Sequence, residues 1–345
     1  MKAVLYERYG QPENVVDIVE RFPRTFIDLD SDHVLVRVHA ASLTYKDLRE
    51  VRGDFRSVGT ANTAQLPAVL GCDVSGVIEA VGRGCKKLRV GDEVIGIVNG
   101  SMAEYVSAPE PQWVRKPKRV SHLHAAAFPY CGVLAFQCLF VHGHLKEKQR
   151  ILVLNGSGGV GSMAVQMARY KGATVYATTS KHVELVKSLG AHHVLDYTKC
   201  QWFEQLRGAN IDLVLDCGVG YAAWIHCEQV LNPAGGRFLS IVTDAPDGPV
   251  DYVGYRFGAT LREYSSKGVY KLVKEVDLKQ RDNRHLAYVA KLVQNGFLKP
   301  VLDPDSPFEF TIKGVQRMMV KLGQKHTRGK LIVSIAGPGA ASMPV

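Results

Sequence analysis

The sequence predicts an α/β fold, a doubly wound parallel sheet joined to a second domain that is a small β-barrel. Residues 1–125 consist of short strand patterns separated by glycine and proline, which is typical of a barrel. From residue 126, strand patterns alternate with helical patterns, which indicates βαβ units and a parallel sheet. Short strands return after Pro300. We therefore expect a first domain of 1–125 completed by 300–345, and a second domain of 126–299.

Each element follows from a local pattern. The first strand is expected to begin at residue 2, and the apolar run "HAAAFPYCGVLAFQCLF" predicts a helix over 124–140. The segment 284–296 is amphipathic and ends at glycine, which predicts a second long helix. Further strands are expected over 33–43, 71–82, 90–97, 103–108, 150–156, 174–179, 193–197, 211–217, 237–242, 308–312 and 330–335, and further helices over 161–171, 182–190, 221–231 and 314–323.

Residues 244–283 are less regular. The stretch "YKLVKEV" (270–276) could form a helix, and the whole segment could serve as a lid or an oligomer contact. The strand "RFLSIV" (237–242) could be an edge strand that pairs across a two-fold axis, so a homodimer is one expectation.

Composition narrows the function. The 345 residues are 46% hydrophobic and carry a formal net charge of +10, with basic runs at "CKKLR" (85–89) and "VRKPKR" (114–119). No aromatic motif is interleaved with these runs, so we expect an anionic cofactor and no specific nucleic acid, and RNA binding is the less favoured alternative. No apolar run reaches roughly 18 residues, so no membrane span is expected. Seven scattered cysteines suggest free thiols in a reducing compartment.

The stretch "ILVLNGSGGVGSMAVQM" (151–167) contains the candidate cofactor site. Gly156, Gly158 and Gly161 match G-x-G-x-x-G between a strand and a helix, the pattern of a dinucleotide-binding loop. A phosphate-binding P-loop would need Lys where Ser162 stands, and a nucleophile elbow would not place Ser157 directly after the first glycine. We expect the helix N-terminus to face the pyrophosphate.

The next strand, "TVYATTSKHVE", indicates which dinucleotide binds. An NAD site needs an acid at the end of this strand to accept from the ribose 2′-hydroxyl, and none occurs before Glu184. Ser180 and Lys181 instead offer a hydroxyl and a cation, which suit a 2′-phosphate. The sequence therefore predicts NADPH as the cofactor, although Lys181 could also be an exposed lysine at a helix start.

The chain resembles the medium-chain dehydrogenase/reductase superfamily, zinc-free quinone oxidoreductase branch, over nearly its whole length, and most of all a mitochondrial NADPH oxidoreductase of that branch. The resemblance implies a GroES-like catalytic domain split around a Rossmann cofactor domain, with the active site in the cleft. The motifs that carry it are "LPAVLGCDVSGVIEAVG", "VGDEV", "AEYV", "HAAAFPY", "NGSGGVGSMAVQMA", "LGAHHVLDY", "DLVLDCGVG" and "HTRGKLIVSI".

The resemblance also implies roles for residues. It places the pyrophosphate on the glycine loop, the adenosine phosphate near the second and third strands, the nicotinamide near Cys217 and Ile241, and the "HTRGK" segment over the cofactor. The cofactor residues so expected are Ser157, Gly158, Gly159, Val160, Gly161, Ser180, Lys181, Tyr197, Cys217, Ile241, His326, Thr327 and Arg328.

No catalytic metal is expected. Where zinc dehydrogenases of similar layout have Cys, His and Cys, this chain has Thr44, Cys72 and, approximately, Tyr130. Catalytic zinc needs three protein ligands, and a single thiolate cannot supply them.

The implied activity is hydride transfer from NADPH to a quinone or another electron-poor acceptor. Thr44, Tyr45 and Lys46 are the candidate stabilisers of the developing oxyanion, and Tyr45 or Lys46 could donate the proton, whereas Asp47 is expected to support the domain. The alternatives are an enone or alkenal double-bond reductase, and a non-catalytic NADPH-binding scaffold that acts through a protein partner. The resemblance implies a mitochondrial location. The chain starts without a recognisable presequence, so the cytoplasm is the alternative.

Overall fold

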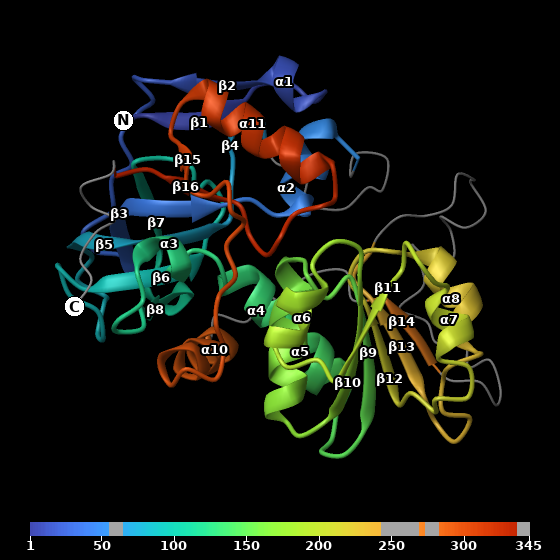
Figure 1. The fold of residues 1–345 in the computed structure, drawn as a ribbon. Helices are drawn as coiled ribbons and strands as arrows, with labels where there is room; N and C mark the ends of the chain where they lie inside the picture. The colour runs from blue at the N-terminus through green and yellow to red at the C-terminus, as the bar shows by residue number, and fades with distance from the viewer. Residues whose placement is uncertain (55–64, 243–268, 273–282, 337–345) are drawn as a thin grey trace. The chain divides into compact units, whose positions relative to one another are not determined.

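The structure is a computed structural model that describes residues 1–54, 65–242, 269–272 and 283–336 (Figure 1). The chain forms two compact units, residues 1–130 with 278–345, and residues 131–277. The helix α10 (Arg284–Gln294) belongs to the first unit. The domain limits drawn from the sequence remain a prediction.

The first unit is built on antiparallel strands. One sheet has the order β15-β16-β3-β5-β6-β8, with β7 also paired to β3, and a smaller sheet has the order β2-β1-β4. The strands are β1 (Ala3–Tyr6), β2 (Val16–Val19), β3 (His33–Ser42), β4 (Ala68–Val69), β5 (Asp73–Val81), β6 (Glu93–Ile97), β7 (Tyr105–Pro109), β8 (Trp113–Arg115), β15 (Phe308–Glu309) and β16 (Ile332–Ser334).

Alternation explains the core of this unit. Along β3 the inward residues Val34, Val36 and Val38 are buried, and of the two residues between them Arg37 is exposed whereas Leu35 is buried as well. The strand β16 pairs antiparallel with β3, so the C-terminal segment completes the sheet begun by the N-terminal one. The helical segments of the unit are α1 (Pro12–Val15), α2 (Tyr45–Arg52), η2 (Glu110–Gln112), α3 (His122–Ala125), α10, α11 (Ile312–Gly323) and the start of α4 (Pro129–Phe136).

The second unit is a parallel sheet. Its strands run in the order β11-β10-β9-β12-β13-β14, and every described pair is parallel. In chain order this is 3-2-1-4-5-6, the doubly wound arrangement that binds ligands where the strand order reverses. The strands are β9 (Arg150–Leu154), β10 (Thr174–Thr179), β11 (His193–Asp196), β12 (Leu213–Asp216), β13 (Arg237–Ser240) and β14 (Val269–Leu272).

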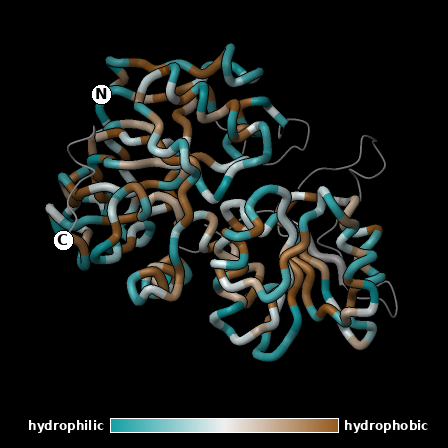
Figure 2. The backbone as a smooth tube through the Cα atoms, viewed as in Figure 1, coloured by the Kyte–Doolittle hydropathy of each residue, from teal (hydrophilic) through white to brown (hydrophobic). Residues whose placement is uncertain are grey.

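Helices cover both faces of this sheet, α5 and α6 on one side and α7 and α8 on the other (Figure 1). On the α7 and α8 side, Trp202 and Cys227 pack with Leu152 and Phe238. The strands are hydrophobic along most of their length because both faces are covered (Figure 2). The helices are α5 (Gly159–Tyr170), α6 (Val183–Ser188), α7 (Trp202–Gln205) and α8 (Tyr221–Cys227), preceded by the rest of α4 and the π-helical turn η3 (Gln137–His142).

Most expected elements are confirmed, but two expectations about the C-terminal half of the sheet are wrong. β13, taken as an edge strand, is paired on one side with β12 and on the other with β14. The residues 269–272, placed partly in a helix, form the strand β14. Residues 244–268 and 273–282 of this segment lie outside the described residues, and so does the segment's expected role as a lid or oligomer contact.

One apolar stretch, His122–His142, is helical through α3, α4 and η3 and is long and apolar enough to cross a membrane. However, 78% of its most apolar window is buried inside the protein. That burial is typical of a core helix of a globular protein.

Candidate active site

The glycine loop of the second unit joins β9 to α5. Asn155, the first residue after β9, has a left-handed φ of 61°, and its backbone N–H donates to Thr178 Oγ1 at 3.1 Å. The next backbone N–H, of Gly156, donates to Thr178 O at 2.8 Å. The loop is therefore fixed to the end of β10 before the helix begins, and Gly158 is the N-cap of α5.

Gly161 shows why this loop needs glycine. A Cβ at Gly161 would lie 2.1 Å from Asn155 O and 2.9 Å from Gly156 Cα, so it would collide with backbone atoms that cannot rotate away. The missing side chain lets the first turn of α5 press against the strand end. The first N–H groups of a helix have no intrahelical acceptor and carry its positive dipole end. This glycine cradle therefore fits the pyrophosphate of a dinucleotide.

The end of β10 offers hydroxyls and a cation. Thr179 Oγ1 donates to the buried Ser157 hydroxyl at 3.1 Å, which links the glycine loop to this strand. Ser180 is half-buried and Lys181 is exposed. The nearest following acid, Glu184, is paired with Lys187 at 2.9 Å one turn further along the helix. This chemistry suits a 2′-phosphate better than a free 2′-hydroxyl.

Tyr197 follows β11 at the same edge of the sheet. Its backbone N–H donates to Thr179 O at 3.1 Å, and its side chain is 43% exposed. The ring is therefore available to a ligand at that edge.

Asp216, which the sequence analysis did not single out, organises the loop after β12. It is fully buried, and its carboxylate accepts the N–H groups of Gly218 (3.0 Å), Val219 (2.8 Å) and Gly220 (2.7 Å) and the Ser240 hydroxyl (2.8 Å). Burial raises the pKa of Asp216, and these hydrogen bonds oppose that rise. An acid at the end of an apolar strand was the available signal in the sequence.

The two residues expected beside the nicotinamide directly follow β12 and β13. Ile241 N–H donates to Asp216 O at 3.0 Å, and Cys217 N–H donates to Leu154 O at 3.2 Å. Burial raises the pKa of the Cys217 thiol well above its usual value, and the neighbouring Cys138 adds to the rise. The carboxyl ends of β9, β10, β11, β12 and β13 thus bring together all the expected cofactor residues of the second unit.

In the first unit, Thr44 is the N-cap of α2. Its backbone N–H and its hydroxyl both donate to Asp47 Oδ2, each at 2.6 Å. The single hydroxyl hydrogen of Thr44 is therefore engaged, and the side chain can offer other groups only its lone pairs. Burial raises the pKa of Asp47, whereas the bonds from Thr44 and the nearby Lys330 charge lower it.

Tyr45 and Lys46 open α2 and are both half-buried. The Lys325 ammonium lies 5.2 Å from the centre of the Tyr45 ring, a cation–π contact. Of the three candidate stabilisers of an oxyanion, Tyr45 and Lys46 are thus the ones with a proton to donate.

The segment His326–Arg328 belongs to the first unit. Arg328 N–H donates to Asp303 Oδ2 at 3.0 Å. The guanidinium Nε of Arg328 is buried, and within the described part of the chain it has no hydrogen-bond partner. A buried N–H without an acceptor is uncommon, so an anionic ligand fits at this side chain. His326 is exposed and Thr327 is half-buried.

The positions that correspond to zinc ligands are occupied otherwise. Burial raises the pKa of the Cys72 thiol, and the charges of Asp47 and Asp73 add to the rise. Tyr130 N–H donates to Asp73 Oδ1 at 2.7 Å. In the described ranges 1–54, 65–242, 269–272 and 283–336, no three His, Cys, Asp or Glu side chains are grouped as metal ligands.

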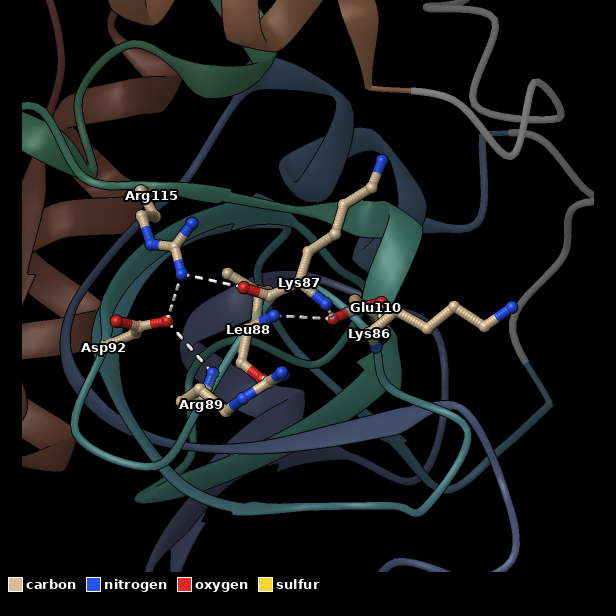
Figure 3. A network of polar contacts seen from close by, with 7 residues as sticks. All are labelled: Lys86, Lys87, Leu88, Arg89, Asp92, Glu110 and Arg115. Carbon is tan, nitrogen blue, oxygen red and sulfur yellow. Dashed lines mark hydrogen bonds and ion pairs between the residues drawn. The ribbon is translucent and has the colours of Figure 1, made fainter.

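The two basic runs of the sequence lie together (Figure 3). Arg115 donates both to Lys87 O and to Asp92 Oδ2, each at 2.8 Å, and so joins the second run to the first. Glu110 accepts three successive backbone N–H groups at 2.7–2.9 Å, those of Lys86, Lys87 and Leu88. Glu110 thus holds the backbone of the first run, and Asp92 holds an arginine of the second run. These contacts give the two basic runs a structural role.

Comparisons with known proteins agree with this arrangement. The family described as alcohol dehydrogenase GroES-like domain matches residues 30–118, and the family described as zinc-binding dehydrogenase matches residues 189–333. The chain is 33% identical to the chloroplastic NADPH-dependent alkenal/one oxidoreductase of Arabidopsis thaliana, over 96% of this chain and 79% of that protein. It is 31% identical to the mitochondrial NAD(P)H oxidoreductase RTN4IP1 of Danio rerio, over 97% of this chain and 91% of that protein.

A solved structure shows the same fold. The quinone oxidoreductase from Coxiella burnetii has a TM-score of 0.78 and 27% sequence identity, and the match covers 97% of this chain and 99% of that one. The two curated relatives are similar to this chain at nearly equal identity, so the likeness does not single out RTN4IP1. The coverage, the fold and the glycine loop lead to one assignment: the chain belongs to the medium-chain dehydrogenase/reductase superfamily and is an NAD(P)H oxidoreductase of the quinone oxidoreductase type.

Proposed function

We propose that this enzyme transfers a hydride from NADPH to a quinone or a related electron-poor acceptor, without a catalytic metal. The observation that carries the choice of NADPH is the end of β10, where Ser180 and Lys181 follow the strand and Glu184 pairs with a lysine of its own helix. The name of the Arabidopsis relative, which specifies NADPH, supports the same choice.

Each group of residues has a role in this proposal. The loop Ser157–Gly161 holds the pyrophosphate, and Ser180 with Lys181 holds the 2′-phosphate. Asp216 fixes the loop that follows Cys217, and Arg328 offers its buried Nε to an anionic part of the cofactor. NADPH, when bound, supplies the hydride, and the protein supplies orientation and electrostatics.

The acceptor gains two electrons with the hydride, and negative charge develops on its oxygen. The Lys46 ammonium or the Tyr45 hydroxyl stabilises that charge and donates the proton that completes the reduction. Thr44 cannot donate while its hydroxyl hydrogen is bonded to Asp47. Its oxygen keeps lone pairs that can accept a hydrogen bond from the acceptor or from a neighbouring donor.

Zinc independence rests on the donor set. A catalytic zinc site needs three protein ligands and favours thiolate, imidazole and carboxylate. The corresponding positions here hold a threonine hydroxyl that donates to Asp47, a buried thiol with a raised pKa, and a tyrosine, and this set offers no thiolate–imidazole–thiolate triad. A chelator is therefore expected to leave turnover unchanged.

A double-bond reductase acting on enones or alkenals is the second candidate. The observation in its favour is the identity of 33% to a relative named for alkenal/one reduction. Both candidates share the cofactor and the charge that develops on oxygen, so the fold does not separate them. A scaffold that binds NADPH without turnover is the third reading.

One experiment separates these functions. Oxidation of NADPH and of NADH is followed with a short-chain ubiquinone analogue and, in parallel, with a small enone. Turnover with NADPH and the quinone supports the proposal, and turnover with the enone alone supports the double-bond reductase. Tight NADPH binding without turnover indicates the scaffold. A preference for NADH would contradict the role given to Ser180 and Lys181.

The compartment is also a proposal. The two curated relatives described above are named as chloroplastic and mitochondrial, and of these two organelles we propose the mitochondrion. Imaging of the tagged natural protein with a mitochondrial marker tests this location, and a diffuse cytoplasmic signal would overturn it.

A further inference from the structure

Lys330 is a buried cation in the first unit, two residues after Arg328. It is 4% exposed, and its ammonium donates to Leu43 O at 2.9 Å and to Asp73 Oδ2 at 2.9 Å. Burying an ammonium is costly unless it is paired and hydrogen-bonded. A buried ion pair is therefore weak evidence of added stability.

Asp73 is the anion of this pair and a junction between elements. It is fully buried, and besides Lys330 it accepts the Ser42 hydroxyl at 2.8 Å and the Tyr130 N–H at 2.7 Å. Its donors come from the end of β3, from α4 and from the approach to β16. The carboxylate thus has a full set of partners, and Lys330 is the one that carries charge.

The Lys330 ammonium also donates to Leu43 O, which lies beside the candidate catalytic residues Thr44, Tyr45 and Lys46. Leu43 directly precedes Thr44, whose own N–H and hydroxyl are held by Asp47. Lys330 therefore fixes the backbone from which Thr44, Tyr45 and Lys46 follow. The two partners of its ammonium lie 287 and 257 residues away in the chain, so this contact exists only in the folded protein.

The backbone of Lys330 is connected by hydrogen bonds to the candidate cofactor segment His326–Arg328. Lys330 N–H donates to Val301 O at 2.9 Å, and Asp303 N–H donates to Lys330 O at 2.9 Å. The Asp303 carboxylate then accepts Arg328 N–H at 3.0 Å. Gly329 between them has a φ of +64°, and a Cβ there would lie 2.1 Å from Val301 O. The segment that presents Arg328 is thus rigidly attached to Lys330.

We infer that Lys330 is a positioning residue, which holds the start of α2 (Thr44–Lys46) and the His326–Arg328 segment in a fixed relation through Leu43 O and Asp73. The inference rests on the proposed function, because that function gives both segments their roles. Lys330 itself touches neither cofactor nor acceptor in this inference. Its effect is geometric, and misplacement of reacting groups by about 1 Å can lower a rate by up to about 100-fold.

The test compares Lys330→Met with the double variant Lys330→Met/Asp73→Asn. The single variant leaves the Asp73 carboxylate buried without its cation and is expected to be unstable. The double variant removes that charge, and the asparagine oxygen can still accept from Tyr130. We expect it to regain most of the thermal stability but to keep a kcat lower by about 10-fold or more, because Leu43 O has lost its donor.

Two further variants complete the design. Lys330→Arg, which keeps a charged donor, is expected to recover part of kcat, and the exposed Lys313→Met serves as the matched control with unchanged kinetics. Recovery of kcat together with stability in the double variant would show that Lys330 only balances charge, and would overturn the inference.

The readout must also distinguish failure of the proposed function. If the unmodified enzyme turns over none of the acceptors, the proposed function fails. The dissociation constant of NADPH, measured by fluorescence titration, still tests the inference. We expect it to rise by about 5-fold or more in the double variant through displacement of Arg328, and an unchanged constant would refute the tie between Lys330 and that segment.

Discussion

Replacement of Gly161 by alanine tests the glycine cradle directly. The added Cβ would lie 2.1 Å from Asn155 O, and contacts under 3.0 Å are essentially never observed, so the loop and the helix must separate by about 0.9 Å. Overpacking of this kind costs about 1–3 kcal/mol. For a unit of this size, a loss of about 2 kcal/mol corresponds to a fall in Tm of about 4–8 °C. Gly161→Ala should also weaken NADPH binding, because the α5 N–H groups move with the helix.

Gly158→Ala is the matched control within the same loop. Its Cβ would meet the end of the Asn155 side chain, with Nδ2 at 3.1 Å, and φ at this position is −74°. A side-chain end can give way, so the stability without ligand should stay close to that of the unmodified protein. The N-cap position nevertheless lies where the pyrophosphate is proposed to approach, so Gly158→Ala should weaken NADPH binding.

The assay pairs thermal unfolding without ligand and titration of NADPH fluorescence. The expected pattern is loss of both stability and binding for Gly161→Ala, and loss of binding alone for Gly158→Ala. A Gly161→Ala protein with unchanged Tm would refute the packing argument. Unchanged NADPH affinity in Gly158→Ala would show that the pyrophosphate does not lie against this loop.

Three other predictions follow from single side chains. Lys181→Ala should raise the KM for NADPH by about 10-fold to 100-fold, because one charge-assisted hydrogen bond is lost, and should leave the KM for NADH unchanged. An equal rise of both KM values would contradict the 2′-phosphate role. Burial lowers the pKa of His122 to about 4, with His39 adding to the effect and Glu93 opposing it. Between pH 6.5 and about 4 the unfolded chain therefore binds a proton that the folded protein does not, so the free energy of unfolding should fall by up to about 3 kcal/mol as pH drops through this window. Urea unfolding of His122→Gln should show a flatter pH dependence, and an identical slope would exclude this histidine as the cause. Asp216→Ala should lower the free energy of unfolding by about 2–4 kcal/mol, because four donors lose their shared buried acceptor, and should weaken NADPH binding. Asp216→Asn should retain part of the stability and part of the NADPH affinity in the same unfolding and titration assays.

Strongly periodic segments were predictable from the sequence. The alternation in 33–43 and the apolar strand 150–156 appear as β3 and β9, because hydrophobic periodicity and glycine are local signals. The order of strands in the sheet is not local. "RFLSIV" carries no mark that distinguishes an edge strand from an inner one, and the structure pairs β13 on both sides. The strand β14 was missed because "YKLVKEV" fits a helix by propensity, while pairing with β13 decided its form.

The candidate site divides in the same way. The glycine loop and the absence of an acid after β10 were readable, because each depends on neighbours in the chain. The hydrogen bond from the Thr44 hydroxyl to Asp47 was harder to predict from the sequence. The two residues are close in the chain, but the direction of the hydroxyl hydrogen depends on the geometry of the helix cap. Asp216 was overlooked because an acid that ends a buried strand reads equally well as a solvent-facing turn residue.

The sequence by itself indicated the family and the division into a barrel and a parallel sheet, and it located the glycine loop, since these depend on residue type and spacing. The choice of NADPH over NADH is proposed from the same local signals. Only the tertiary structure decided how the buried polar groups are partnered. The Lys330 ammonium meets Asp73 across 257 residues and Leu43 across 287, and the Arg328 backbone is held by Asp303. A buried charge needs hydrogen-bonding partners, and the folded chain supplies them from segments that can be far apart in the sequence. The spacing of residues along the sequence therefore does not show which groups become partners.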